Sequence, residues 1–358
     1  MTGLVVASTN GRVGIEAAIE VLRGGGSAVD AVVAGIRPVE ATPEDHSVGY
    51  GGLPNLLGEV ELDASLMDGK TLASGAVGAL RGYQDAILLA RRVMEDLPHV
   101  LIVGEGASRL AAEVGLPARD LLTAEAERVW RERLDGAGAG SAYVARVREM
   151  VARLSRDPEM PEETHGTVNV IARDGAGNIA CGVSTSGWAW KYPGRLGDSP
   201  IIGAGNYADN RWGAAACTGR GEMAQRLCTA HAVVAAMRVG SSLEAALAQA
   251  VVDLHALDDP YRSEVNVIGV DKDGGHAAVS TVAGKTYVFM DTEMRAPVEA
   301  ERRHAAPPDG RCQQSEDVAV NGKRSKSSGI KRVAGCSGSL RLCLETQGNE
   351  EGGRGISV

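Results

Sequence analysis

The hydrophobic positions in residues 1–40 predict one strand followed by two helices. The apolar run 4–8 is typical of a buried strand. Glycines at 24–26 end the first helix, and Ser27 with Asp30 forms the capping-box pattern that opens the second. The apolar positions that recur at helical spacing along the two helices are Ile15, Ala18, Ile19, Leu22, Val29, Val32, Val33 and Ile36.

The pattern continues as a mixture of helical and strand-like segments up to about residue 290. Helical segments are predicted at 82–133, with breaks, at 221–238 and at 241–254, where Ser241 and Glu244 form a second capping-box pattern. Strand-like segments are predicted at 60–67, 264–270, 276–282 and 286–290. We therefore expect one large domain that contains both helices and strands.

The chain beyond residue 300 differs in character from the predicted domain. Residues 301–358 are rich in Gly, Ser, Lys and Glu and have no hydrophobic period. Such a segment cannot bury enough apolar surface to offset the entropy of ordering. We expect it to be a disordered tail.

A hairpin is predicted in the middle of the chain, with strands at 167–174 and 178–185 around a Gly-Ala-Gly turn. If the turn is centred on Ala176, Thr167 and Thr185 are equally distant from it and directly opposed. Their Cβ atoms would lie about 4.5 to 5.5 Å apart. Threonine favours strands in general, so the pair alone is ordinary.

The position of Thr167 gives the pair a chemical interpretation. A threonine hydroxyl is a weak nucleophile unless a base takes its proton, and the residue's own α-amino group can do so once it becomes a chain terminus. That amine titrates at about 7.7 to 8.0. The mechanism requires a cut between Gly166 and Thr167. The polar segments 135–140 and 156–163, which we expect to be mobile, lie just upstream, where a chain is cut most easily.

Two later segments carry groups that suit such a reaction. Arg195 could bind a carboxylate and Asp198 an ammonium, which together would recognise the α-carboxylate and α-amine of an amino acid. A surface salt bridge is the simpler interpretation of this loop. Thr218 and Gly219 precede a predicted helix and could stabilise an oxyanion, although Thr-Gly before a helix is also an ordinary capping signal.

Composition and charge restrict the partners and the interior. A net charge of -9 argues against binding nucleic acid, because phosphate binding draws on clustered Lys and Arg. No apolar run is long enough to span a membrane and no secretory signal is recognised, so we expect a cytoplasmic protein. The cysteines lack a Cys-x-x-Cys pair and the histidines a His-x-x-x-His pair, so we expect buried reduced thiols and neither a metal nor another cofactor.

Several motifs resemble the glycosylasparaginase and plant-type (isoaspartyl) asparaginase family of N-terminal-nucleophile hydrolases over roughly residues 4–290. They are Gly-Gly-Ser-Ala-Val-Asp-Ala-Val at 25–32, Ser-Val-Gly-Tyr-Gly-Gly at 47–52, Leu-Asp-Ala-Ser-Leu-Met-Asp-Gly at 62–69, Ala-Ser-Gly-Ala-Val-Gly at 73–78, His-Gly-Thr-Val at 165–168, Gly-Arg-Leu-Gly-Asp-Ser-Pro at 194–200, Gly-Ala-Gly-Asn-Tyr-Ala at 203–208 and Cys-Thr-Gly-Arg-Gly-Glu at 217–222.

The resemblance implies an α+β fold, an αββα four-layer sandwich, and self-cleavage into an α chain of residues 1–166 and a β chain from residue 167, whose part in the domain runs to about 300. Two such αβ heterodimers would associate as a dimer. The site residues that it implies are Thr167 as nucleophile, Thr185 as its assistant, Thr218 and Gly219 as the oxyanion hole, and Arg195, Asp198 and Ser47 as substrate-binding residues.

Two positions depart from the glycosylasparaginase pattern. This chain has His165-Gly166-Thr167 at the predicted cut, as the plant-type asparaginases do, where glycosylasparaginases carry His-Asp-Thr. Asn10 stands where they carry a tryptophan, whereas the motif at Ser47 is similar to theirs. The leading prediction is hydrolysis of N4-(β-N-acetylglucosaminyl)-L-asparagine. An L-asparaginase or β-aspartyl dipeptidase is the close alternative, and an uncleaved, inactive binding protein is the alternative of another class.

Overall fold

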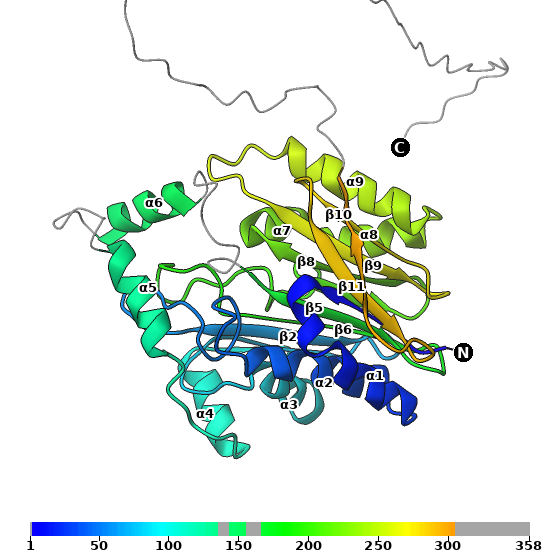
Figure 1. The fold of residues 1–358 in the computed structure, drawn as a ribbon, viewed down its shortest axis with the longest axis horizontal. Helices are drawn as coiled ribbons and strands as arrows, with labels where there is room; N and C mark the ends of the chain where they lie inside the picture. The colour runs from blue at the N-terminus through cyan, green and yellow to red at the C-terminus, as the bar shows by residue number, and fades with distance from the viewer. Residues whose placement is uncertain (1, 135–142, 155–165, 305–358) are drawn as a thin grey trace, which may run out of the picture. The chain divides into compact units, whose positions relative to one another are not determined.

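The computed structural model describes residues 2–134, 143–154 and 166–304 (Figure 1). The helices are η1 (Thr9–Val13), α1 (Ile15–Arg23), α2 (Ala28–Glu40), α3 (Ala86–Asp96), α4 (Glu105–Glu113), α5 (Ala124–Leu134), α6 (Tyr143–Leu154), α7 (Gly221–Leu227), α8 (Thr229–Arg238) and α9 (Leu243–Ala256). The expected mobile segment 135–140, the segment 156–163 and most of the expected tail lie outside the described residues. No described helix is both long and apolar enough to cross a bilayer.

The strands alternate with these helices and form two sheets. Their bounds are β1 (Leu4–Ser8), β2 (Leu62–Asp68), β3 (Ser74–Leu80), β4 (Leu101–Val103), β5 (Val168–Arg173), β6 (Ile179–Thr185), β7 (Asn206–Asp209), β8 (Gly213–Gly219), β9 (Val265–Asp271), β10 (His276–Ser280), β11 (Thr286–Asp291), β12 (Val298–Glu301) and β13 (Arg303–His304). The prediction of a fold that mixes helices and strands is therefore confirmed.

The larger sheet has the strand order β12-β11-β1-β5-β6-β2-β3-β4. All its neighbouring strands are antiparallel except β3 and β4. Helices α1, α2 and α3 cover one face, as Figure 1 shows. Their apolar side chains, among them Ile19, Val32 and Ile87, pack with those of the sheet in one buried cluster. The apolar helical positions predicted from residues 15–36 are thus in the core, with Val29 only half-buried.

The smaller sheet has the order β13-β10-β9-β8-β7 and is covered by α8 and α9. A separate apolar cluster joins the opposite faces of the two sheets. Ile171, Ile179 and Val183 reach it from the larger sheet, and Ala214 and Ala216 from the smaller one. Small alanine side chains on one side let the sheets approach closely, which suits a chain with only 3% aromatic residues.

The hairpin predicted at the centre of the chain is confirmed in its register. Strands β5 and β6 are antiparallel, with Val168 opposite Ser184 and Arg173 opposite Ile179. Pairs in this ladder are equidistant from Ala176, so the same register continued by one residue opposes Thr167 and Thr185. Both strands are buried throughout, because β1 and β2 flank the hairpin and α2 packs against it.

Several predicted elements differ from the structure. The single helix predicted at 221–238 is two helices, because Cys228 adopts φ 49° and separates α7 from α8. The second capping box is wrong, since Ser242 rather than Ser241 caps α9 and accepts from the Ala245 N–H. Strand β4 interrupts a segment predicted to be helical. The chain also stays in the sheets through β12 and β13, beyond the boundary predicted at residue 300.

The last residue of α2, Glu40, is a fully buried carboxyl group beneath the hairpin. Its Oε1 accepts hydrogen bonds from the Ser184 hydroxyl at 2.6 Å and the Ile87 N–H at 2.9 Å. Burial raises the pKa of Glu40 from 4.5 to about 8, although these hydrogen bonds act in the opposite direction. Glu40 is therefore protonated in the folded protein at neutral pH.

Replacement of Glu40 by Gln tests this protonation through the pH dependence of stability. The raised pKa means that the folded chain binds the proton more tightly than the unfolded chain between about pH 4.5 and 8. The contribution of Glu40 to stability is complete below this window and is lost as pH rises through 8. We expect the free energy of unfolding of the wild type, relative to Glu40→Gln, to fall by on the order of 3 kcal/mol from pH 5 to 8.5. Urea denaturation measures the free energy of unfolding at each pH, with the exposed Glu16→Gln as control. A difference between wild type and Glu40→Gln that stays constant with pH would contradict the raised pKa of Glu40.

Candidate functional site

The residues on both sides of the predicted cut line a cleft of about 410 Å³. Five of the predicted site residues meet there: Ser47, Gly166, Thr167, Thr218 and Gly219. They come from distant parts of the chain, since Thr167 precedes β5 of the larger sheet and Thr218 and Gly219 end β8 of the smaller one. The cleft thus lies where the ends of strands from both sheets come together.

Two hydroxyl groups donate to the same carbonyl oxygen at the predicted cut. Thr167 Oγ1 and Thr185 Oγ1 each lie 2.7 Å from the Gly166 oxygen. Thr167 is 8% exposed and Thr185 is 2% exposed, so water competes little for these bonds. The arrangement places one hydroxyl beside the carbonyl that it would attack and a second hydroxyl on the oxygen where negative charge would develop.

Backbone groups fix the position of the Thr185 hydroxyl. Its oxygen accepts a hydrogen bond from the Gly187 N–H at 2.8 Å and lies 3.2 Å from the Ser47 carbonyl oxygen. Ser47 is itself held, because its hydroxyl donates to Asp45 Oδ1 at 2.6 Å. Asn10, the departure noted in the sequence, donates to Asp45 Oδ2 at 2.9 Å and lines the same cleft.

The turn at the end of β8 presents Thr218 and Gly219 to the cleft. Gly219 has φ 107°, and a Cβ atom there would lie 2.2 Å from the Glu264 carbonyl oxygen. Only glycine satisfies both conditions, so this backbone conformation depends on the residue type. A strand end of this kind can direct a hydroxyl and a backbone N–H toward one point, as an oxyanion hole requires.

Asn266 is a cleft residue that was not predicted from the sequence. It lies on β9 directly opposite Thr218 and is 7% exposed. Its Nδ2 donates to Glu264 Oε1 at 3.2 Å, whereas its Oδ1 has no hydrogen-bond partner among the described residues. An amide in a strand whose other residues up to Val270 are Val, Ile and Gly was the available signal. Its position makes it a neighbour of the candidate oxyanion donor.

Arg195 does not line this cleft; it lines a neighbouring pocket of about 210 Å³. Its Nε and Nη2 lie 3.0 and 2.9 Å from Glu222 Oε1. Arg220 contacts the other oxygen of Glu222 at 3.2 Å and lies over the Trp188 ring. Burial opposes ionisation of Glu222, but the charges of Arg195 and Arg220 hold its pKa below the usual value. The simple surface salt bridge considered for Arg195 is therefore replaced by a largely buried pair with Glu222.

Asp198 lies beside the start of α7 and lines neither the cleft nor the pocket of Arg195. A Cβ atom on Gly221 would lie 2.7 Å from Asp198 Oδ1, so the carboxylate is packed against the backbone that follows Gly219. Burial raises the pKa of Asp198 from 3.8 to about 7, and the charge of Arg195 partly offsets the effect. The carboxylate is therefore poised to gain a proton close to neutrality.

The cysteines within the described residues are free thiols. Cys181 and Cys217 are buried, as expected, and burial raises the pKa of both thiols. Cys228 is exposed, which corrects the expectation of buried thiols, because it occupies the left-handed turn between α7 and α8. Within the same residues, no three His, Cys, Asp or Glu side chains form a group able to hold a metal ion.

Comparison with known proteins places this geometry in a family. The asparaginase family model matches residues 7–298. The chain is 42% identical over 286 residues to the N(4)-(β-N-acetylglucosaminyl)-L-asparaginase of Elizabethkingia miricola, covering 78% of this chain and 79% of that protein. It is 37% identical to the isoaspartyl peptidase/L-asparaginase of Mus musculus, covering 80% and 81%. It is also 37% identical to the plant-type L-asparaginase of Pyrococcus abyssi, covering 76% and 86%.

The two-sheet fold and these matches together define an amidohydrolase of the N-terminal-nucleophile class. Within that class the chain belongs to the asparaginase family. The resemblance stated from the motifs is thereby confirmed. The roles of the individual site residues stay predictions.

Proposed function

We propose that this chain cuts itself between Gly166 and Thr167 and then uses Thr167 to hydrolyse the side-chain amide of N4-(β-N-acetylglucosaminyl)-L-asparagine. The observation that carries the proposal is the placement of the Thr167 and Thr185 hydroxyls on the Gly166 carbonyl oxygen, both at 2.7 Å. The 42% identity to a relative named for this substrate supports the choice of substrate.

In the proposed maturation, Thr167 Oγ1 attacks the carbonyl carbon of Gly166. The carbon–nitrogen bond between the two residues breaks, an ester forms on Oγ1, and the hydroxyl proton passes to the freed α-amine. Thr185 stabilises the negative charge on the Gly166 oxygen while the tetrahedral intermediate exists. Water then hydrolyses the ester, which releases the Gly166 carboxylate and restores the hydroxyl.

In the proposed turnover, the same hydroxyl attacks the substrate's side-chain carbonyl. The α-amine of Thr167 takes the hydroxyl proton and transfers it to the leaving amine. Thr218 and Gly219 hold the oxyanion, which their place in the cleft beside Thr167 supports. An aspartyl ester forms on Oγ1, and water releases aspartate from it.

Arg195 and Asp198 would hold the α-carboxylate and α-amine of the aspartyl group. Arg195 already faces a carboxylate in Glu222, so the substrate would share the guanidinium rather than meet a free cation. Ser47 contributes through the loop that borders Thr185. Because Arg195 lines the neighbouring pocket whereas Thr167 lines the cleft, the leaving group would extend into the cleft on the Thr167 side.

The arrangement of sheets and helices supports a four-layer αββα sandwich as the finer description of the fold. Helices α1, α2 and α3 cover one sheet, α8 and α9 cover the other, and an apolar cluster joins the sheets. By the family resemblance, the assembled enzyme would be a dimer of αβ heterodimers.

The cleft itself favours a second candidate, hydrolysis of asparagine or of β-aspartyl dipeptides. Among the described residues that line the cleft none is aromatic, so no ring is present on which a sugar could stack. Lys285 and Arg302 do line it, and they would suit the free carboxylate of a departing amino acid. Two of the relatives are named for these activities.

Replacement of Thr167 tests the proposed nucleophile. Thr167→Ala lacks the hydroxyl, so we expect a single chain of 358 residues and a loss of amidase activity on the order of 10³-fold or more. Thr167→Ser keeps a hydroxyl and should still yield two chains. Intact-mass analysis and N-terminal sequencing follow the cut. A Thr167→Ala protein that appeared as two chains would contradict the mechanism.

Asp198 predicts a pH dependence of substrate binding. The carboxylate must be ionised to hold an ammonium, and its pKa is about 7. We expect KM to rise about tenfold for each pH unit below 7 and to be constant above it, because the protonated form accumulates in that proportion. Asp198→Asn should raise KM at pH 8 and remove the dependence. Steady-state kinetics on cleaved protein measure this, and a KM that is flat from pH 5.5 to 8 excludes the role.

Turnover of two substrates by one cleaved preparation separates the candidate functions. For the leading proposal we expect kcat/KM to be at least about tenfold higher for N4-(β-N-acetylglucosaminyl)-L-asparagine than for a β-aspartyl dipeptide, which corresponds to about 1.4 kcal/mol in the barrier. The reverse ratio would establish the second candidate. Aspartate release measured with both substrates gives the comparison directly.

A further inference from the structure

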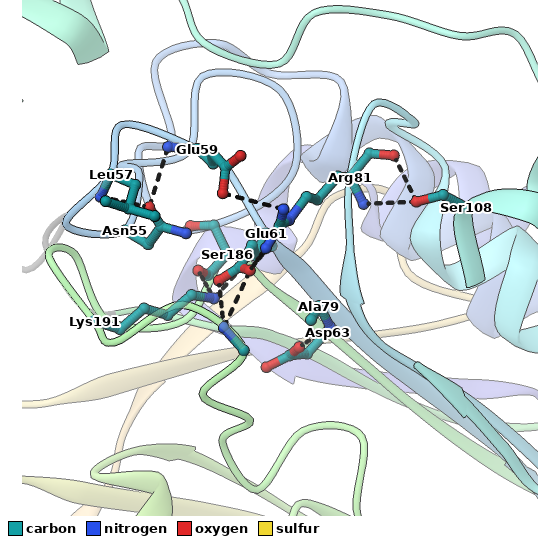
Figure 2. Close-up of polar contacts among 11 residues, drawn as sticks. Asn55, Leu57, Glu59, Glu61, Asp63, Ala79, Arg81, Ser108, Ser186 and Lys191 are labelled. Carbon is teal, nitrogen blue, oxygen red and sulfur yellow. Dashed lines mark hydrogen bonds and ion pairs between the residues drawn. The ribbon is translucent and has the colours of Figure 1, made fainter. Parts of the chain in front are cut away.

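A buried ammonium group lies between the two parts of the proposed site. Lys191 is 2% exposed and follows β6 in the segment that leads to Arg195. Its Nζ donates to the Ser186 carbonyl oxygen at 2.9 Å and to the Glu61 carbonyl oxygen at 3.0 Å, as Figure 2 shows. The Lys191 ammonium group therefore links Ser186, which follows Thr185, to Glu61, which precedes β2.

The first of these contacts reaches the hydroxyl of Thr185. The Gly187 N–H, in the peptide that follows Ser186, donates to Thr185 Oγ1 at 2.8 Å. Gly187 has φ 71°, and a Cβ atom there would lie 2.9 Å from Lys191 Nζ. The ammonium is thus packed against the backbone unit that orients the candidate assistant of Thr167.

The second contact connects Lys191 to Glu61, and the side chains of Glu61 and Asp63 bind the backbone on both sides of Arg195. The buried Glu61 carboxylate accepts the Gly194 N–H at 3.1 Å, and the buried Asp63 carboxylate accepts the Gly197 N–H at 3.3 Å. Burial lowers the pKa of Lys191, and the nearby charges of Asp63 and Glu61 act in the opposite direction. Lys191 therefore belongs to the same group of buried charges that holds the Arg195 loop.

Stability alone gives little reason for such a lysine. Removing an ammonium from water is costly, and an apolar side chain of similar volume often serves the folded state as well or better. The Nζ contacts give a different reason, because hydrogen bonds to two carbonyl oxygens fix both segments relative to one point.

We propose that Lys191 is a positioning residue that sets the Thr185 end of β6 and the Arg195 loop relative to each other. This inference rests on the proposed function. It assigns one residue, Lys191, to the positioning of both the cleavage site and the substrate-binding loop. Through Ser186 and Gly187 it places the Thr185 hydroxyl on the Gly166 carbonyl. Through Glu61 it places Arg195 for the substrate carboxylate.

The test compares Lys191→Met with Arg81→Met. Arg81 contacts the Glu61 carboxylate at 2.7 Å from the half-exposed side (Figure 2). Within the described residues, no hydrogen bond or ion pair joins Arg81 directly to the segments at 186–187 or 194–197. We expect Lys191→Met to slow the cut at Gly166 at least tenfold and, once cut, to raise KM at least tenfold with a smaller effect on kcat. Arg81→Met should leave the rate of the cut within about twofold, because the Arg81 side chain binds Glu61 and not the backbone at Ser186 and Gly187.

Urea midpoints measured for both variants separate positioning from general destabilisation. Equal losses of cleavage and binding in the two variants, in proportion to lost stability, would overturn the proposal. So would a Lys191→Met protein with wild-type cleavage and KM. Chemical rescue gives an independent arm: ethylammonium should partly restore cleavage in Lys191→Ala, and tetramethylammonium, which has no N–H to donate, should not. Equal effects of the two ions would count against the role.

Amide hydrogen exchange keeps the proposal separate from the proposed function. We expect the Gly187 and Gly194 N–H groups to exchange at least tenfold faster in Lys191→Met than in the wild type, and the Gly187 N–H to be unchanged in Arg81→Met. If the wild-type chain stayed whole, the proposed function would fail, yet this comparison would still decide whether Lys191 fixes the two segments. Unchanged exchange at both amides would reject it.

Discussion

The backbone ladder between β5 and β6 is the interaction on which the proposed site depends. Its register, centred on Ala176, continues to an opposed Thr167 and Thr185. A shift of one residue would turn every side chain of the hairpin to the other face and would separate the two hydroxyls from the Gly166 carbonyl. The register is fixed because both strands are buried in the middle of an eight-stranded sheet, between β1 and β2.

The packing of the two sheets supplies the second half of the geometry. The candidate nucleophile immediately precedes a strand of one sheet, and the candidate oxyanion residues end a strand of the other. The distance between them is set by the apolar cluster in which Ala208, Ala214 and Ala216 face larger side chains such as Ile171 and Val183. Larger residues at these alanine positions would push the sheets apart and would separate the candidate nucleophile from the candidate oxyanion residues.

Local signals in the sequence were sufficient for the elements whose pattern is short-range. The Gly-Ala-Gly turn and the strands around it predicted the hairpin, and the Ser27 capping box fixed the start of α2. Strands β3 and β8 escaped prediction because Ala- and Gly-rich runs such as Gly213–Gly219 have little strand propensity, and β7 escaped it because Asn and Asp are depleted in strands. Their strand state comes from pairing with distant partners, which no local pattern contains.

The same limit applies to the candidate site. Thr167, Thr185, Thr218 and Gly219 could be named because each lies at a chemically suggestive boundary in the chain. The pairing of Arg195 with Glu222 and of Thr218 with Asn266 depends on how separate segments pack. Lys191 could not be predicted for a related reason, since the sequence around a lone lysine in a loop does not indicate that its side chain will be buried.

The strand order of the larger sheet bears on the lifetime of the enzyme after the proposed cut. Read along the sheet, β12 and β11 come from the second piece, β1 from the first, β5 and β6 from the second, and β2, β3 and β4 from the first. The strands of the two pieces are interleaved, and neither piece could dissociate without breaking the hydrogen bonds of three strand pairs. The two pieces of such an enzyme would therefore stay paired with the partner from the same precursor and would not exchange between molecules. Pieces once separated would lack the covalent link that first brought those strands into order.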